Sequence, residues 1–405
     1  MSTSLLYHAW NLKDYRYLRT EYSEGAIVFH VERKAKRRFC SSCKSSDVVL
    51  DGRRERRWKA APIGGRTVRL AVHLHRQSCR NCGVRRLEPL TFADPKKSFT
   101  RQLARHVLAL CRRSTIADVA FEVGLPWDAV CDIVRSDLEA RKKRIDVRGL
   151  THIAIDEVSV GKGQTNYLTV VLDLWSGRAV YVVEGRGKAG LTAFFKRLRR
   201  LRVRLRAVAM DMHEPFRLAV REHLGPRVAI VFDHFHVAKL FNEQLDEVRR
   251  DEVRQVVGAE GRRLIKGCRY LLLKGAEKLK PDGKQRLDAL LAVNAKLSTA
   301  YILKEALREC WKSNGRAQAK REFNDWIAQA KASGIPRVAK FADTLIKHMD
   351  GILNYFTHPI STGPLEAFNN KIGVLKRRAY GFRNRKFLML RVLFLHECRR
   401  DLIGS

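Results

Sequence analysis

His-Ile-Ala-Ile-Asp-Glu-Val, residues 152–158, is a short apolar run that ends in two adjacent carboxylates. The pattern predicts a buried strand that delivers an acidic residue to the edge of a sheet. Two further apolar runs end in the same way, at Asp211 and at Asp233. Sites in open α/β sheets form just beyond the carboxyl ends of strands. A single Asp in this place often only begins a turn, but three such ends favour a shared acidic site.

The residues that follow predict a mixed α/β domain. Strands are expected at 152–158, 166–174, 178–184, 206–211 and 228–233, and helices at 189–201 and 214–223. Three strands joined by hairpins, followed by alternating helices and strands, give the βββαβαβ order of a ribonuclease H-like domain with a mixed five-stranded sheet. Asp156 would lie on the first, central strand and Asp211 at the end of the neighbouring fourth strand. Long, charged helices at about 239–355 predict an α-helical insertion in a domain that spans 149–405.

The composition indicates a folded and strongly basic protein. The 405 residues include 80 Lys and Arg against 42 Asp and Glu, a net charge of +38, and 45% of the residues are hydrophobic. Such a charge attracts polyanions, so nucleic acid is the predicted partner. A basic protein of membrane surfaces would carry a long amphipathic basic segment or a lipidation signal, and neither is found. Without a signal peptide or a run of about 18 apolar residues, a cytoplasmic, nucleoid-associated protein with no membrane partner is expected.

Four of the nine cysteines have the spacing of a metal site. They form two pairs, Cys40 with Cys43 and Cys79 with Cys82, which follow predicted strands at 25–33 and 67–75. Two such pairs can complete a tetrahedral Zn²⁺ site. We therefore predict a structural zinc in a zinc-ribbon DNA-binding domain at 1–95. The linker 44–78 is longer than the compact pattern of about 15 to 20 residues, and four buried thiols without metal are the alternative.

Residues 96–148 predict a helix-turn-helix domain. Helices are expected at 100–113, at 116–123 and from Pro126, with a turn at Gly124 and with Trp127 facing inward. The third helix exposes Asp128 and Asp132, which suit phosphates poorly, so a plain three-helix packing unit is the alternative. Upstream, the basic and aromatic run 53–59 is interpreted either as a loop that contacts phosphates or as solvated charge.

A last helix is predicted from the stretch 361–378. Gly363 would cap it and Pro364 would begin it, which places Glu366 in the first turn, on the side away from the buried stripe. An acidic residue near a helix amino terminus is favourable for dipole reasons alone, by about 0.3 to 1 kcal/mol. The following run 379–386 mixes aromatic and basic residues, which suits nucleic-acid contact.

Five segments of the chain form a recognisable set: Ile155-Asp156-Glu157, Glu184-Gly185-Arg186, Met210-Asp211-Met212, the run 232–237 and the run 366–384. Together they resemble the DDE transposases of bacterial insertion sequences, most closely the ISL-three group. The resemblance covers nearly the whole chain. It departs at Ala367, where Gly is expected, and at His234, where Arg is common.

The resemblance implies an α/β ribonuclease H-like catalytic domain, preceded by a zinc ribbon and a helix-turn-helix. Its catalytic residues would be Asp156, Asp211 and Glu366, which would hold two Mg²⁺ ions, with Mn²⁺ as a substitute. Cleavage of a phosphodiester by water needs a nucleophile formed at neutral pH and stabilisation of the leaving oxygen, and two metal ions provide both. Carboxylate oxygens suit such hard ions. Supporting or DNA-contacting roles are expected for Glu157, Asp233, His236, Asn370, Lys376, Arg377 and Arg383.

The implied function is that of a DNA transposase. Such a protein binds the ends of an insertion sequence, cleaves the DNA and transfers the 3′-OH ends to target DNA, and we expect at least a dimer in the DNA complex. Two alternatives belong to other classes: a sequence-specific DNA-binding regulator with an inactive transposase-like domain, and a ribonuclease H-like nuclease that cuts without joining.

Glu157 is expected on the opposite face of the pleat from Asp156.

Overall fold

The computed structural model describes residues 5–34, 38–163 and 166–397. The chain divides into two compact units, residues 1–144 with 397–405, and residues 145–396. Each unit has a hydrophobic core of its own. Within the described ranges, none of the helices has the length and apolar character needed to span a bilayer.

The amino-terminal unit is built on a five-stranded sheet in the order β1-β2-β4-β3, with β5 paired to β4. Its elements are α1 (Leu5–Trp10), β1 (Tyr15–Ser23), β2 (Ala26–Arg33), β3 (Val48–Ile63), β4 (Arg66–Cys79) and β5 (Arg85–Leu87). The basic run 53–59 lies within β3, so the interpretation of this run as a loop is wrong. Every second residue of a strand faces the same side, and Trp58, opposite Leu70 on β4 and 1% exposed, anchors this run to the core.

Three helices follow the sheet, as predicted for a helix-turn-helix: α2 (Arg101–Leu110), α3 (Ile116–Val123) and α4 (Trp127–Lys142). The hydroxyl of Thr100 accepts the N–H of Leu103, and Thr115 forms a capping box with Asp118. Gly124 ends α3 with φ of 57°, a left-handed conformation that glycine adopts readily. The prediction for Trp127 is wrong, because this first residue of α4 lies outside the buried stripe and is 52% exposed.

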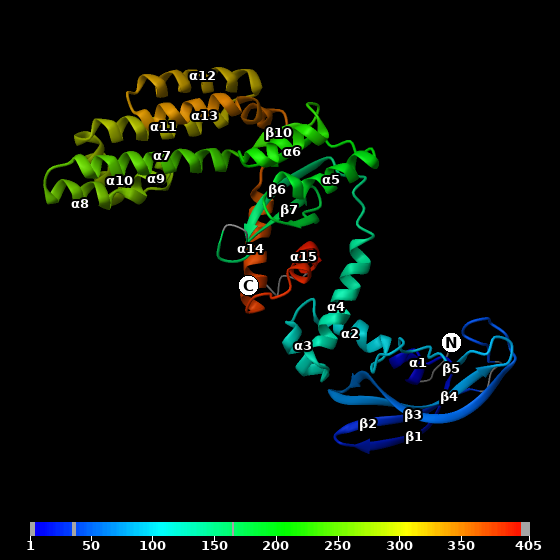
Figure 1. Ribbon diagram of the computed structural model, residues 1–405. Helices are drawn as coiled ribbons and strands as arrows, with labels where there is room; N and C mark the ends of the chain where they lie inside the picture. The colour runs from blue at the N-terminus through cyan, green and yellow to red at the C-terminus, as the bar shows by residue number, and fades with distance from the viewer. Residues whose placement is uncertain (1–4, 35–37, 164–165, 398–405) are drawn as a thin grey trace. The chain divides into compact units, whose positions relative to one another are not determined.

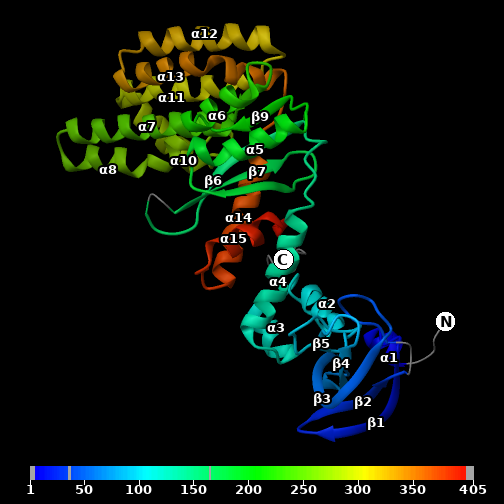
Figure 2. The ribbon, with the colours of Figure 1, turned by 45° about the vertical axis from the view of Figure 1, so that its right-hand side comes forward.

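The carboxy-terminal unit contains the predicted mixed sheet, in the order β10-β9-β6-β7-β8 (Figures 1 and 2). Strands β7 and β8 run antiparallel in a meander from β6, whereas β9 and β10 run parallel to β6. The elements are β6 (His152–Ser159), β7 (Tyr167–Asp173), β8 (Ala179–Glu184), α5 (Lys188–Arg200), β9 (Ala207–Met210), α6 (Glu214–Leu224) and β10 (Ala229–Phe232). The order βββαβαβ is the one expected of a ribonuclease H-like domain.

One face of this sheet is covered by α5 and α6. Ile153 and Ile155 of β6 point to that face, where they join Phe194 of α5 and Phe216 of α6 in the core. Because side chains alternate along a strand, Asp156 must point to the opposite face. The alternation therefore separates a hydrophobic face from a polar one at the end of β6.

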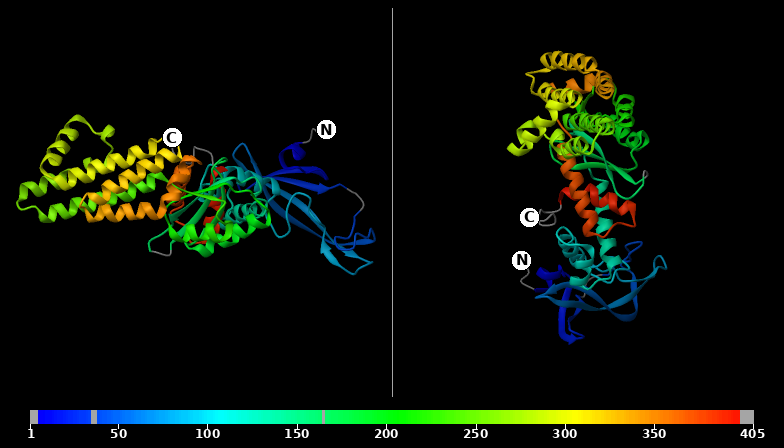
Figure 3. Two further views of the ribbon diagram at one scale, coloured as in Figure 1. Left: turned by 90° about the horizontal axis from the view of Figure 1, so that it is seen from above. Right: turned by 90° about the vertical axis from the view of Figure 1, so that its left-hand side faces the viewer.

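After β10 the chain forms an elongated bundle of helices (Figures 1 and 3). They are α7 (His234–Gln255), α8 (Ala259–Gly267), α9 (Arg269–Leu273), α10 (Pro281–Val293), α11 (Ala295–Glu309), α12 (Arg316–Ala332) and α13 (Pro336–Leu353), with short 3₁₀ turns at Ala276–Lys278, Cys310–Lys312 and Asn354–Phe356. Trp326 is 2% exposed and lies in the bundle core. This core is continuous with that of the sheet: one cluster of buried side chains includes both Met210 of β9 and Trp326 of α12.

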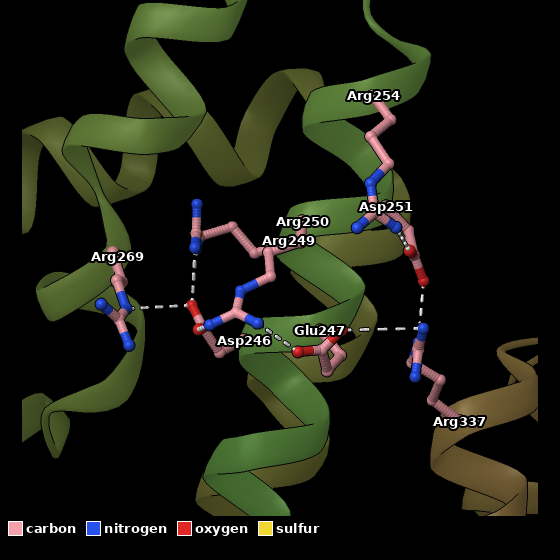
Figure 4. A network of polar contacts seen from close by, with 8 residues as sticks. All are labelled: Asp246, Glu247, Arg249, Arg250, Asp251, Arg254, Arg269 and Arg337. Atoms are coloured by element: carbon pink, nitrogen blue, oxygen red, sulfur yellow. Dashed lines mark hydrogen bonds and ion pairs between the residues drawn. The ribbon is translucent and has the colours of Figure 1, made fainter.

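A network of ion pairs crosses the bundle (Figure 4). The buried carboxylate of Asp246 on α7 accepts a hydrogen bond from the guanidinium of Arg249 at 2.8 Å. It also forms an ion pair with Arg269 of α9 at 3.2 Å. Further along α7, the carboxylate of Asp251 accepts a hydrogen bond from the guanidinium of Arg337 on α13 at 2.8 Å. The helix α7 is thereby tied to two other helices of the bundle.

The chain returns from the bundle to the sheet and ends in two helices, α14 (Gly363–Arg378) and α15 (Arg385–Leu393), followed by a 3₁₀ turn at Leu395–Glu397. Helix α14 packs beside β6 and α15 beside β8. Leu365, Phe368 and Ile372 form the buried stripe of α14.

Candidate active site

Three aspartates lie in a row across the sheet. The parallel register pairs Ala154 of β6 with Ala209 of β9, and Phe232 of β10 with Met210 of β9. Continued by one or two residues, the register brings Asp156, Asp211 and Asp233 side by side on the face opposite α5 and α6. Pairing of β6 with β7 continues to Ser159, so Asp156 lies inside its strand and not at its end.

Two backbone N–H groups fix the carboxylates of Asp156 and Asp211. The N–H of Glu157 donates to Oδ1 of Asp156 at 2.7 Å, and the N–H of His213 donates to Oδ1 of Asp211 at 3.1 Å. Each Asp therefore keeps its other oxygen, Oδ2, for a different partner.

Burial raises the pKa of Asp156 to about 6, from an ordinary value of 3.8. The negative charge of Asp211 adds to this rise, whereas the Glu157 N–H and the imidazole of His236 oppose it. A carboxylate that is both buried and beside another carboxylate is costly to ionise. A bound divalent cation would relieve this cost, so the donor set fits a metal that prefers oxygen ligands.

Helix α14 reaches this row through a residue that the sequence did not single out. The amide Nδ2 of Asn369 donates to Oδ2 of Asp156 at 2.8 Å. Residues three apart on a helix share one face, so Glu366, one turn before Asn369, lies on the face that is turned to β6, and it is exposed. The neighbouring Asn370, which was expected to take part, is exposed as well. Because Asn369 and Asn370 are adjacent residues of the same type, the sequence does not indicate which of them contacts Asp156.

The amino terminus of α14 is held by Asp233. Oδ2 of Asp233 accepts the backbone N–H of Thr362 at 2.6 Å and its hydroxyl at 2.5 Å. Thr362, and not Gly363, caps α14, because its carbonyl accepts the N–H groups of Leu365 and Glu366. The imidazole of His236 lies 3.5 Å from the Thr362 hydroxyl. Asp233 and His236 are thus joined to the helix that carries Glu366.

Glu157 points away from Asp156, as the alternation of the strand requires. Its carboxylate faces Arg186 at 3.8 Å and Nδ1 of His213 at 3.9 Å. Burial raises the pKa of Glu157, and the charge of Asp211 adds to the shift while His213 opposes it. Glu157 therefore lies beneath the row of aspartates and not within it.

The basic residues predicted near the site differ in their surroundings. Lys376 of α14 donates to the backbone carbonyl of Ser159, at the end of β6, at 3.0 Å. Arg377 and Arg383 are exposed. Lys376 thus fastens α14 to the sheet, while the two arginines face solvent.

The four cysteines of the amino-terminal unit come together as predicted. The sulfur atoms of Cys40, Cys43, Cys79 and Cys82 all lie within 4.8 Å of one another. The Sγ atoms of Cys40 and Cys82, and those of Cys43 and Cys79, are 3.6 Å apart. A tetrahedron with Zn–S bonds of about 2.3 Å has sulfurs about 3.8 Å apart. Backbone N–H groups of Cys43 and Ser42 lower the pKa of Cys40 to about 6, which favours the thiolate that binds metal. The cluster can therefore bind zinc.

Comparison with known proteins identifies the class. A family model described as "Transposase" matches residues 153–392, and one described as "Helix-turn-helix domain of transposase family ISL3" matches residues 88–136. The transposase for insertion sequence element IS1001 of Bordetella parapertussis is 33% identical, with 90% of each chain covered. The transposase for insertion sequence element IS1557 of Mycobacterium tuberculosis is 29% identical over 97% of this chain and 94% of the relative. A chain of the Drosophila P element transposase strand transfer complex aligns with 74% of this chain and 93% of its own, at a TM-score of 0.36 and 12% identity.

The protein is a transposase, an enzyme that cleaves DNA. It belongs to transposase family ISL3, as the family models and the relative from Bordetella show. Membership implies a divalent metal in the catalytic domain and DNA as a partner of the helix-turn-helix. The resemblance drawn from the sequence is confirmed, and so is the predicted fold class.

Proposed function

We propose that Asp156, Asp211 and Glu366 are the catalytic residues of this transposase and its metal ligands. The observation that carries the proposal is the register of β6 and β9, which sets Asp156 beside Asp211. The hydrogen bond from Asn369 to Asp156 supports the inclusion of Glu366, because Asn369 lies one turn further along the same helix face.

The ions held by these carboxylates are Mg²⁺, with Mn²⁺ as a substitute, and a two-ion site fits the number of acidic groups. When bound, the ions supply a nucleophile from water at neutral pH and neutralise charge on the leaving oxygen. The protein orients the ligands: the Glu157 N–H holds one oxygen of Asp156 and Asn369 directs the other. The buried surroundings of Asp156 strengthen every charge interaction made there.

The amino-terminal unit would recognise the ends of the element. Zinc held by Cys40, Cys43, Cys79 and Cys82 would fix the open end of the β3–β4 hairpin, where Val48 pairs with Cys79. The helix-turn-helix would bind DNA in the cytoplasm, at the nucleoid. Two ends must be joined to one target, so at least a dimer would assemble on DNA. Each freed 3′-OH would then attack a phosphodiester of target DNA in the same site, and the bond from phosphorus to the target's 3′ oxygen would break as the new phosphodiester forms.

The test is cleavage and strand transfer with end-containing DNA and Mg²⁺. Asp156→Asn, Asp211→Asn and Glu366→Gln should each lower the cleavage rate by about 1,000-fold, equivalent to the several kcal/mol that a metal contributes. DNA affinity should change little, because each substitution removes one negative charge and no DNA-binding group. Asp325→Asn, at an exposed position of α12, is the matched control and should cleave normally.

An unchanged cleavage rate in Asp156→Asn would show that the assignment is wrong. Cleavage without joined products in the unsubstituted protein would instead remove only the strand-transfer step, and would indicate a nuclease. Separating linear from joined DNA on a gel distinguishes the two outcomes.

A further inference from the structure

The carboxylate of Asp233 is buried between two segments that are far apart in sequence. Asp233 and Thr362 are each 2% exposed and stand 129 positions apart. Oδ1 of Asp233 accepts the N–H of Phe235 at 2.8 Å and so caps α7, the first helix of the bundle. Oδ2 accepts the N–H and hydroxyl of Thr362, the residue that caps α14. One side chain therefore holds the start of the bundle and the start of the last long helix.

The returning end of the bundle meets the same place. The ring of His348 on α13 packs against Phe232 with 5.1 Å between ring centroids, and Nδ2 of Asn354 donates to the carbonyl of Ile230 at 2.8 Å. A Cβ at Gly351 would lie 2.3 Å from Cδ2 of Phe232, so only glycine permits this approach. The returning end of the bundle is thus packed against β10, immediately before Asp233.

A short chain of hydrogen bonds leads from this place to Glu366. The N–H of Thr362 donates to Asp233, and the carbonyl of Thr362 accepts the N–H of Glu366 at 2.9 Å. Bonds to a buried ionised group are stronger than neutral ones. The first turn of α14 is therefore fixed to β10 through a single carboxylate.

We propose that Asp233 is a positioning residue that sets the place of Glu366 by clamping Thr362 at the base of the helical bundle. The proposal rests on the catalytic role assigned to Glu366 and adds a cause for its position. Asp233 touches neither DNA nor metal in this role. It makes the geometry of the site depend on how the bundle is seated on β10.

Two substitutions weaken the clamp by different amounts. Asp233→Asn can keep the cap of α7 through its remaining oxygen, but it turns an N–H donor toward the N–H of Thr362. Thr362→Val removes the hydroxyl bond and keeps the backbone bond, whereas Thr362→Ser restores both. We expect the single-turnover cleavage rate to fall about 100-fold in Asp233→Asn, the size of effect that a misplacement of about 1 Å produces. In Thr362→Val the cleavage rate should fall about tenfold, which corresponds to the loss of one hydrogen bond to a charged group. In Thr362→Ser the cleavage rate should stay near that of the unsubstituted protein.

The position of α14 is measured independently by hydrogen exchange. In Asp233→Asn, amides of the first turn of α14 should exchange faster, and amides of α11 and α12 should not. DNA affinity should stay within about twofold, because no DNA contact is removed. The matched control is Asn294→Ala, which removes the cap of α11 and its bond to Glu252 far along the bundle. It should speed exchange in α11 and leave both α14 and the cleavage rate unchanged.

Unchanged exchange in α14 of Asp233→Asn would overturn the clamp. Equal loss of cleavage in Thr362→Ser and Thr362→Val would also overturn it, since the hydroxyl would then not matter. Normal cleavage by Glu366→Gln would instead refute the catalytic role of Glu366, and faster exchange in α14 would still be expected. The two failures are therefore distinguishable.

Discussion

The side chain of Asp156 is buried, yet its proposed role as a metal ligand requires the ionised carboxylate. Its pKa of about 6 in the folded protein exceeds the ordinary value of 3.8, so the folded state holds the proton more tightly than the unfolded state. The stability that this group contributes is fully present below pH 4 and is lost as the pH rises through about 6. Ionised Asp156 thus destabilises the metal-free protein at neutral pH.

Asp156→Asn should therefore stabilise the protein at pH 7.5 in Mg²⁺-free buffer, by about 1 to 3 kcal/mol. Oδ1 of Asn369, which is buried without a partner among the described residues, can accept the new amide after a side-chain flip. The gain should disappear below pH 4. Urea unfolding at both pH values measures it, and a less stable variant at pH 7.5 would contradict the raised pKa.

The sequence predicts the placement of some single residues correctly and of others not. The face of Asp156 and Glu157 followed from the alternation of a strand, which depends on nearest neighbours alone. Asn369 was missed because its role depends on the rotation of α14 against β6, which is set by tertiary packing. Trp127 was misplaced for a related reason: apolar character predicts burial, but a helix-end position decided its exposure.

The ion pairs of α7 show how one element is held in the bundle. Burial alone would raise the pKa of Asp246, but its bond to Arg249 and the charges of Arg269 and Arg250 lower it overall. Asp246→Ala leaves the buried Arg249 without its partner and should destabilise the protein by about 3 to 5 kcal/mol. Thermal unfolding tests this, with Asp325→Ala as an exposed control expected within about 0.5 kcal/mol.

Elements were predicted best where the pattern was local. All five strands of the catalytic sheet, and the helices α5 and α6, lie within a residue or two of their predicted bounds. Strand β3 was interpreted as a loop because its middle is a run of charged residues, and the partner strand that pairs with it lies further along the chain. A strand is hard to recognise from sequence when its middle residues are charged and only one residue, here Trp58, marks the buried side.

Across the whole molecule, metal is expected in two chemically different sites. Cys43→Ser should lose the zinc, which we expect as one ion per chain, and weaken binding to end DNA, because metal binding and local folding are coupled. Mn²⁺ binding at the carboxylates should remain, since those ligands belong to the other unit. Elemental analysis and Mn²⁺ titration measure both, and Cys268→Ser, at a buried cysteine outside the cluster, should retain zinc.

The continuous core of the sheet and bundle has a consequence for how such a chain can change over time. A shorter relative cannot arise by simple loss of the segment between Asp233 and Thr362, because Phe232, which packs against His348 and Gly351 of α13, would lose its cover. Any such deletion must be accompanied by new polar residues on β10, or the product will aggregate. Because they share one core, we expect the bundle and the sheet to fold as one unit.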